Sequence, residues 1–154
     1  MKPLLTYSIT LIIVLLITSC GESVPDKVEW ADEEKTIKLW ERKTENGVTA
    51  VTYYYSDGTK KRLDHFKGMK RDGKMTKWYN NGKLEYEKEY SNGLKSGAHK
   101  SYYSNGQISS ERFFKEGKRE QTWSYYLING EKWLIESYQE NSLASVDRLL
   151  NTTL

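Results

Sequence analysis

The sequence contains few of the residues that carry thiol or metal chemistry. It has one cysteine, Cys20, and two histidines, His65 and His99, among 154 residues. A lone cysteine has no intrachain disulfide partner. The histidines stand at different positions of the repeat described below, and neither has a cluster of acids beside it. A metal site needs several ligands at matched spacing. We therefore expect no metal and interpret both histidines as exposed strand residues.

Catalytic motifs are also missing. The sequence shows no Ser/His/Asp arrangement and no phosphate-binding loop, so we expect no cofactor. Glu85, Glu87 and Glu89 alternate along one predicted strand and lie about 7 Å apart, a separation that does not by itself exclude a glycosidase pair. A single open sheet, however, offers no concave pocket that would raise the pKa of one carboxyl group over that of another. A solvated charged face is favoured, and we expect no enzyme.

The one long apolar run lies at the start of the chain. Residues 4–17 are apolar or small, follow Lys2 and end just before Cys20. This run is shorter than the roughly 20 residues needed to span a bilayer. A cation, a short apolar run and small residues before a cleavage point are typical of a secretory signal peptide, here residues 1–19. The alternative is a plain signal anchor whose cysteine is incidental.

The boundary sequence ITSC, residues 17–20, resembles the lipobox of bacterial lipoproteins. The resemblance implies that Cys20 is lipidated and holds the mature chain to a membrane, because two or three acyl chains anchor stably. Glu22 stands where lipoproteins retained in the inner membrane carry aspartate. The resemblance therefore favours the outer membrane of the cell envelope if the organism is Gram-negative.

Charge is unevenly distributed along the mature chain. Residues 20–59 carry a net charge of −4, residues 60–119 carry +9, and residues 120–154 carry −3. The basic middle fits an anionic lipid, polysaccharide or acidic protein as partner. It also fits solvated strand edges whose lysines discourage aggregation. Nucleic acid is a poor partner for an exported protein.

A repeat of 24 residues runs through the middle of the chain. Four Asx-Gly pairs keep this step and end at Gly58, Gly82, Gly106 and Gly130. Two aromatic rows keep the same step: Tyr54, Trp78, Tyr102 and Tyr126, and then Phe66, Tyr90, Phe114 and Tyr138. Gly93 and Gly117 form a further glycine series. Such self-similarity indicates a repeat architecture in which neighbouring units cover one another.

Each repeat is predicted to be a β-hairpin. Asn-Gly and Asp-Gly favour type I′ turns, whose two central residues need positive φ. Between the turns, apolar and charged residues alternate with period 2, as in KLEYEKEY over residues 83–90. The fold class is all-β, a single-layer antiparallel β-meander of about eight or nine strands. Residues 141–152 fit a short C-terminal helix with Leu143, Val146, Leu149 and Leu150 on one stripe.

Residues 78–97 and 102–118 resemble the variant MORN repeat (membrane occupation and recognition nexus). Aromatic-Tyr, Asn-Gly, a second aromatic and further glycines stand in its order, whereas the copy at 54–77 departs more and the last stops after one hairpin. The resemblance implies a non-enzymatic scaffold or membrane-associated binder. Some bacterial relatives are YwqK-type antitoxins, which implies a protein-neutralising partner.

These patterns predict the following organisation: a signal peptide at 1–19, an acidic tether at 20–36, the repeat domain at 37–140 and a C-terminal cap or tail at 141–154. We expect an unidentified protein as partner, with a carbohydrate or peptidoglycan as the alternative. Successive strand residues point to opposite faces. Trp78 and Tyr102 are assigned to packing, which leaves Tyr55, Tyr79 and Tyr103 as the candidate contact stripe, with a second packed face as the alternative.

Overall fold

The structure, a computed structural model, describes residues 26–149, and Cys20 lies outside them. All regular elements within this range are strands. Their bounds are β1 (Lys27–Trp30), β2 (Lys38–Glu45), β3 (Val48–Tyr54), β4 (Lys60–Lys67), β5 (Lys70–Arg71), β6 (Gly73–Trp78), β7 (Leu84–Ser91), β8 (Leu94–Tyr102), β9 (Ile108–Lys115), β10 (Lys118–Tyr126), β11 (Lys132–Gln139) and β12 (Ser142–Arg148). No helix in this range is long and apolar enough to cross a membrane.

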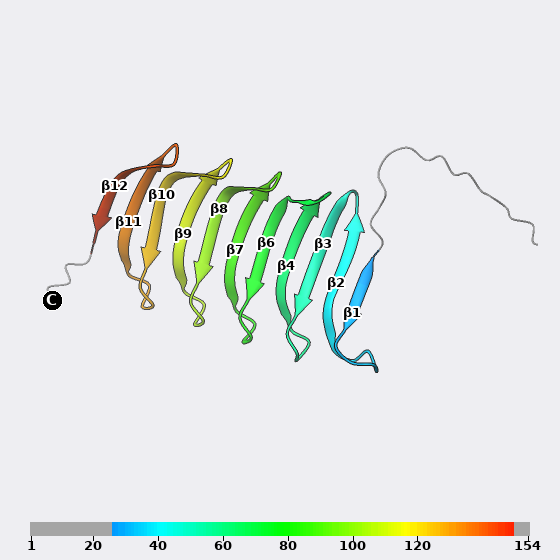
Figure 1. Ribbon diagram of the computed structural model, residues 1–154. Coiled ribbons are helices and arrows are strands. Elements are labelled where there is room, and N and C mark those ends of the chain that lie inside the picture. The colour runs from blue at the N-terminus through cyan, green and yellow to red at the C-terminus, as the bar shows by residue number, and fades with distance from the viewer. Residues whose placement is uncertain (1–25, 150–154) are drawn as a thin grey trace, which may run out of the picture.

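The strands form one antiparallel sheet in chain order. Each strand pairs with the next along the chain, except that β4 pairs with both β6 and the two-residue β5. Figure 1 shows this meander from blue β1 to red β12. The predicted all-β meander is confirmed. It has 12 strands rather than eight or nine, because the diverged segment before residue 54 and the segment after residue 140 also pair as strands.

The C-terminal helix prediction is wrong for the part of residues 141–152 that the structure describes. Residues 142–148 form β12, which pairs with β11. Glu140 and Asn141 both have positive φ, 46° and 72°, and so build a tight hairpin turn without glycine. An isolated short helix carries a nucleation cost, whereas the free edge of β11 offers ready backbone partners. Similarly, β1 lies inside residues 20–36, the segment expected to be a tether.

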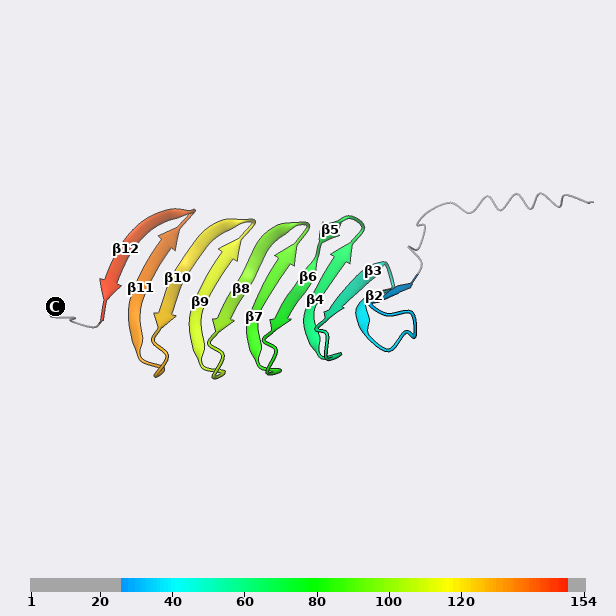
Figure 2. The same ribbon diagram turned by 60° about the horizontal axis from the view of Figure 1, so that its bottom comes forward.

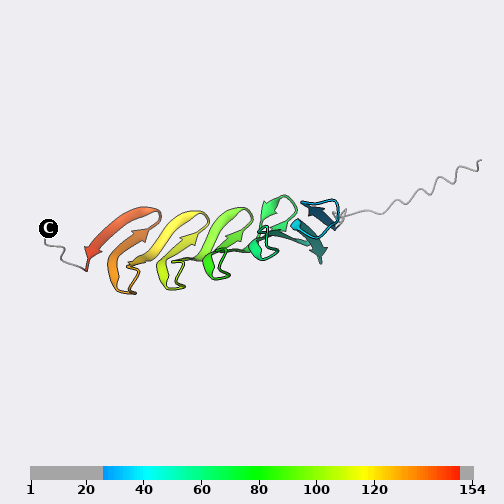
Figure 3. The same ribbon diagram turned by 90° about the horizontal axis from the view of Figure 1, so that it is seen from below.

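The strands bow, and the sheet forms an open trough rather than a flat layer (Figures 2 and 3). Residues paired across antiparallel strands point to the same side of the sheet. These pairings place Met75, His99, Phe114, Trp123 and Tyr138 on one side, and all five side chains are buried. We call this side the ring-stack face. The other side, the opposite face, carries the pair Glu87–Lys100 and the pair Lys100–Glu111.

Two turn types alternate along the sheet. At Asn92-Gly93 both residues have positive φ, 51° and 88°, as type I′ requires. At Asn81-Gly82 only the glycine does, at 78°, and its N–H donates to the Tyr79 carbonyl at 3.0 Å. The type I′ prediction is therefore wrong at this second kind of turn. The positive φ of the glycine is nevertheless required there, because a Cβ makes this conformation costly.

Asparagine side chains link two of these turns to the same turn of the next repeat. Asn81 Oδ1 accepts from the Lys83 N–H at 3.1 Å, and Asn81 Nδ2 donates to the Ser104 carbonyl at 2.9 Å. Asn105 repeats both contacts, to Gln107 and Ile128. The carboxamide thus closes its own turn and ties it to the next one, which a carboxylate cannot do because it lacks the donor.

Candidate functional site: the ring-stack face

A continuous stack of rings crosses the C-terminal half of the ring-stack face. It runs through Tyr90, His99, Phe114, Trp123 and Tyr138, one ring on each of β7 to β11. Successive ring centroids lie 5.7, 4.5, 5.1 and 4.6 Å apart with tilts of 46–51°. These are favourable separations for aromatic pairs. The predicted row at 90, 114 and 138 supplies alternate members of the stack.

The other members of the stack, His99 and Trp123, belong to a second series of positions at the 24-residue step, which was not predicted from the sequence. Met75, His99 and Trp123 are 24 residues apart and all buried, at 8%, 3% and 7% exposure. Because Met, His and Trp share no obvious chemistry, the row was not apparent. The interpretation of His99 as an exposed strand residue is wrong. His65 is half-buried on the opposite face, with Nδ1 2.6 Å from the Lys74 carbonyl oxygen.

His99 is held neutral in the stack. Burial lowers its pKa to about 4, and the nearby cations Lys95, Lys88 and Arg112 contribute in the same direction. Its Nε2 lies 2.8 Å from the Glu89 carbonyl oxygen. Because a carbonyl can only accept, Nε2 carries the proton and donates it. This hydrogen bond opposes the lowering without reversing it.

A row of exposed cations lies beside the stack at the same 24-residue step. The guanidinium carbon of Arg71 lies 5.8 Å from the Tyr90 centroid, Lys95 Nζ lies 4.9 Å from Phe114, and the guanidinium carbon of Arg119 lies 5.2 Å from Tyr138. These distances are in the range of cation–π attraction. Within residues 26–149 none of the three cations forms an ion pair with a carboxylate.

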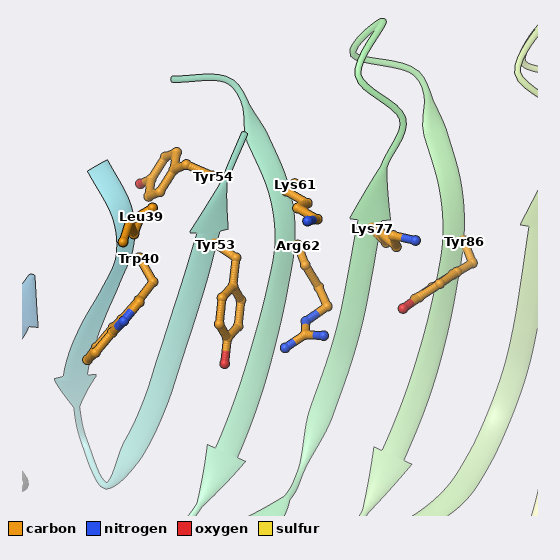
Figure 4. A pocket seen from close by; sticks show the side chains of 8 residues that line it. All are labelled: Leu39, Trp40, Tyr53, Tyr54, Lys61, Arg62, Lys77 and Tyr86. Atoms are coloured by element: carbon orange, nitrogen blue, oxygen red, sulfur yellow. The ribbon is translucent and has the colours of Figure 1, made fainter. Parts of the chain in front are cut away.

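The N-terminal half of the sheet holds a shallow hollow of about 480 Å³. Figure 4 shows Trp40, Tyr53, Arg62 and Tyr86, which belong to β2, β3, β4 and β7. The guanidinium of Arg62 lies 4.2 Å from the Tyr53 centroid. Two of the three cations that line the hollow are balanced: Arg62 Nε lies 2.9 Å from Asp64 Oδ2, and Lys77 Nζ lies 2.8 Å from Glu85.

The candidate contact tyrosines bridge neighbouring repeats. The hydroxyls of Tyr55, Tyr79 and Tyr103 each donate to a backbone carbonyl of the next repeat, at Trp78, Tyr102 and Tyr126, over 2.7 Å. All three side chains are half-buried. The geometry favours a role in joining repeats over a free contact stripe. The six predicted turn glycines, Gly58, Gly82, Gly93, Gly106, Gly117 and Gly130, all have φ between 78° and 93°.

The charged side chains do not suggest a metal centre. Within residues 26–149 no three His, Cys, Asp or Glu side chains come together as metal ligands would. The side chains that do converge on the ring-stack face are rings and cations. Such a surface can bind an anion or an aromatic group.

Comparison with known proteins agrees with the repeat pattern. The family model described as MORN repeat variant matches residues 71–92 and 95–116. No curated protein matches the chain. Two solved structures resemble it weakly at 12% identity: a mutant of S. aureus TarM in complex with fondaparinux, alpha-GlcNAc-glycerol and UDP, at a TM-score of 0.42, and TarM, at 0.41.

Each of these two similarities covers 74% of this chain and 20% of the TarM chain. This chain thus spans about a fifth of the TarM length, and TM-scores this low carry no functional argument. The family match is more informative, because its two segments follow the 24-residue step of the hairpins. Residues 71–116 therefore hold two MORN repeat variants, a repeat type that suggests a binding scaffold.

Proposed function

We propose that this protein is a lipid-anchored, non-catalytic scaffold that binds a protein partner on its ring-stack face. The observation that carries the proposal is the row of Arg71, Lys95 and Arg119. These three side chains are exposed, lie against rings and have no carboxylate partner in residues 26–149. Rings and arginines are the groups that dominate the energetics of protein interfaces.

Affinity capture from crosslinked cells tests this proposal. The chain with Arg71, Lys95 and Arg119 all changed to Gln should lose its captured protein. A matched control changes Lys67, Lys115 and Lys118 to Gln, which removes the same charge from exposed positions on the opposite face. Equal capture by both triple variants would rule out the ring-stack face as the binding surface.

The anchoring part of the proposal depends on Cys20, outside the described residues. It is supported by the ITSC boundary and by the apolar run before it. Mass spectrometry of the mature N-terminus should find an acylated cysteine. A Cys20→Ser chain should appear in the soluble fraction, and an unmodified cysteine in membrane-released protein would contradict the proposal.

An antitoxin or immunity-like role is a finer form of the same proposal. It follows from the resemblance to YwqK-type proteins and not from a particular residue. If it holds, the captured partner should be a toxic protein of the same cell. Co-expression with this chain should then restore growth, and the Arg71/Lys95/Arg119 variant should not.

Carbohydrate or peptidoglycan binding is the second candidate function. The specific observation is the hollow in Figure 4, where Trp40, Tyr53 and Tyr86 stand beside cations already balanced by Asp64 and Glu85. Rings beside cations that are mostly paired with carboxylates suit an uncharged sugar better than an anion. Peptidoglycan pull-down with wild-type protein and Tyr53→Ala separates this candidate from the first, because the triple variant should leave pull-down unchanged.

A further inference from the structure

One position of the 24-residue repeat carries side chains of different charge in successive repeats. Asp64, Lys88, Arg112 and Glu136 follow one another at the 24-residue step on the ring-stack face. The two acids at the ends each have a partner of their own. Arg62 Nε lies 2.9 Å from Asp64 Oδ2, an ion pair in which neither Asp64 oxygen accepts a hydrogen bond, and Glu136 accepts from the hydroxyls of Tyr125 and Tyr138. The two central cations have no such carboxylate partner in the described part of the chain.

These two cations are also partly withdrawn from water. Lys88 is half-buried with Nζ 3.7 Å from the Tyr86 centroid. Burial lowers its pKa, and repulsion from Arg112 and Lys95 adds to that lowering. Arg112 Nε is buried without a hydrogen-bond partner, although Nη2 reaches Ser101 Oγ at 3.4 Å. Half-buried charge without a carboxylate partner destabilises a fold, and proteins keep it mainly at functional sites.

A third cation completes the cluster around the buried His99. Lys88 lies on β7, Lys95 on β8 with His99, and Arg112 on β9, where it pairs directly with His99. All three cations act on the His99 ring electrostatically. Lys95 is exposed above Phe114, whereas Lys88 and Arg112 lie deeper. The cluster thus has one exposed cation and two half-buried cations, next to the aromatic rings of the stack.

We propose that Lys88, Lys95 and Arg112 form an anion site that binds a carboxylate of an acidic, partly apolar segment of the protein partner. This inference rests on the proposed function and names the partner's chemistry. A guanidinium and two ammonium groups provide charge-assisted donors for a carboxylate. The rings of Tyr90 and Phe114 provide an apolar surface for neighbouring side chains. The headgroups of a flat bilayer would not reach the half-buried Lys88 and Arg112. A carboxylate side chain of one extended peptide would reach them.

The test uses the full chain and a short fluorescein-labelled peptide of alternating glutamate and leucine. Fluorescence anisotropy should show binding that is at least about tenfold weaker for Lys88→Met/Arg112→Met, a loss of about 1.4 kcal/mol, since two charge-assisted donors are removed. Lys67→Gln/Lys115→Gln is the control, with equal charge loss on the opposite face, and should bind nearly as wild type does. A peptide in which glutamine replaces glutamate should not bind.

Thermal melts separate binding from folding. Lys88→Met keeps an apolar stem against Tyr86 and removes the repulsion, so its melting temperature should rise while peptide affinity falls. A fall in both would mean that Lys88 is structural and would overturn the site.

The site would also be overturned if the peptide failed to bind or bound both double variants equally. Binding of inorganic phosphate or phosphatidylglycerol vesicles, lost in the Lys88/Arg112 variant while the peptide does not bind, would overturn the carboxylate assignment. Loss of cellular capture by the Arg71/Lys95/Arg119 variant would still support the proposed function in these cases. The two ideas can therefore fail separately.

Discussion

His99→Phe tests the electrostatics of the ring stack through the pH dependence of stability. In the folded chain the pKa of His99 is lowered to about 4, whereas an unfolded histidine titrates near 6.5. Between these values the unfolded state binds the extra proton, so the free energy of unfolding falls as the pH falls. The contribution of neutral His99 is complete above about pH 6.5 and is lost progressively toward pH 4.

The magnitude follows from the two pKa values. From pH 7 to pH 5, titration of His99 should lower the free energy of unfolding by about 2 kcal/mol. Phenylalanine does not titrate, but it gives up the 2.8 Å hydrogen bond to the Glu89 carbonyl. That loss should cost about 1 kcal/mol at all pH values. The variant should therefore be about 1 kcal/mol less stable than wild type at pH 7 and about 1 kcal/mol more stable at pH 5.

Urea unfolding followed by tryptophan fluorescence measures this crossing. Hydrogen bonding also lowers the pKa of Asp32, Glu41 and Asp57, so their contributions too are lost as the pH falls through their folded values. They are present in both proteins and cancel in the difference between them. Two parallel stability curves from pH 7 to pH 5 would refute the buried, neutral state of His99.

Three further predictions concern the links between repeats. Gly82→Val should cost about 1–2 kcal/mol because Gly82 has φ of 78°, and Gly82→Asn should cost less; equal melting temperatures would contradict the turn geometry. Asn81→Asp should lower the melting temperature because the donor to Ser104 is lost, whereas Asn129→Asp should not, since its turn is the last of the series. Tyr79→Phe/Tyr103→Phe should lower the free energy of unfolding in urea by about 1 kcal/mol for each hydrogen bond lost. An unchanged midpoint would contradict the role of these hydroxyls in joining repeats and would favour the contact stripe.

Sequence periodicity predicted the hairpins well because turn chemistry and strand alternation are local. Asn92-Gly93 specifies its own turn, and the 24-residue step then fixes which strands become neighbours. The C-terminal strand was missed because its turn uses Glu140 and Asn141, a pair with no glycine to mark it. Its Leu143 and Val146 fit a helical stripe as well as a strand, and only pairing with β11 decides between them.

The tyrosine bridges could not be predicted from residue types. Tyr55, Tyr79 and Tyr103 donate to backbone carbonyls, and every residue has a carbonyl, so no sequence signal marks the acceptor. The cation cluster was visible only as the net +9 of residues 60–119. That sum did not separate Lys95 on the ring-stack face from Lys118 on the opposite face.

The repeat itself separates structure from function in this chain. Registers that keep one chemistry, such as the aromatic series ending at Tyr138 or the asparagine series ending at Asn129, hold one hairpin to the next. A register can also change its chemistry and still pack, as Met75, His99 and Trp123 do. A change in the sign of charge is different, because packing does not require it. The register of Asp64, Lys88, Arg112 and Glu136 changes sign twice, yet it points to the face that buries the rings. Stability alone would favour an uncharged residue at a half-buried position without a carboxylate partner. The two cations that remain there are therefore best explained by a ligand that supplies the missing negative charge.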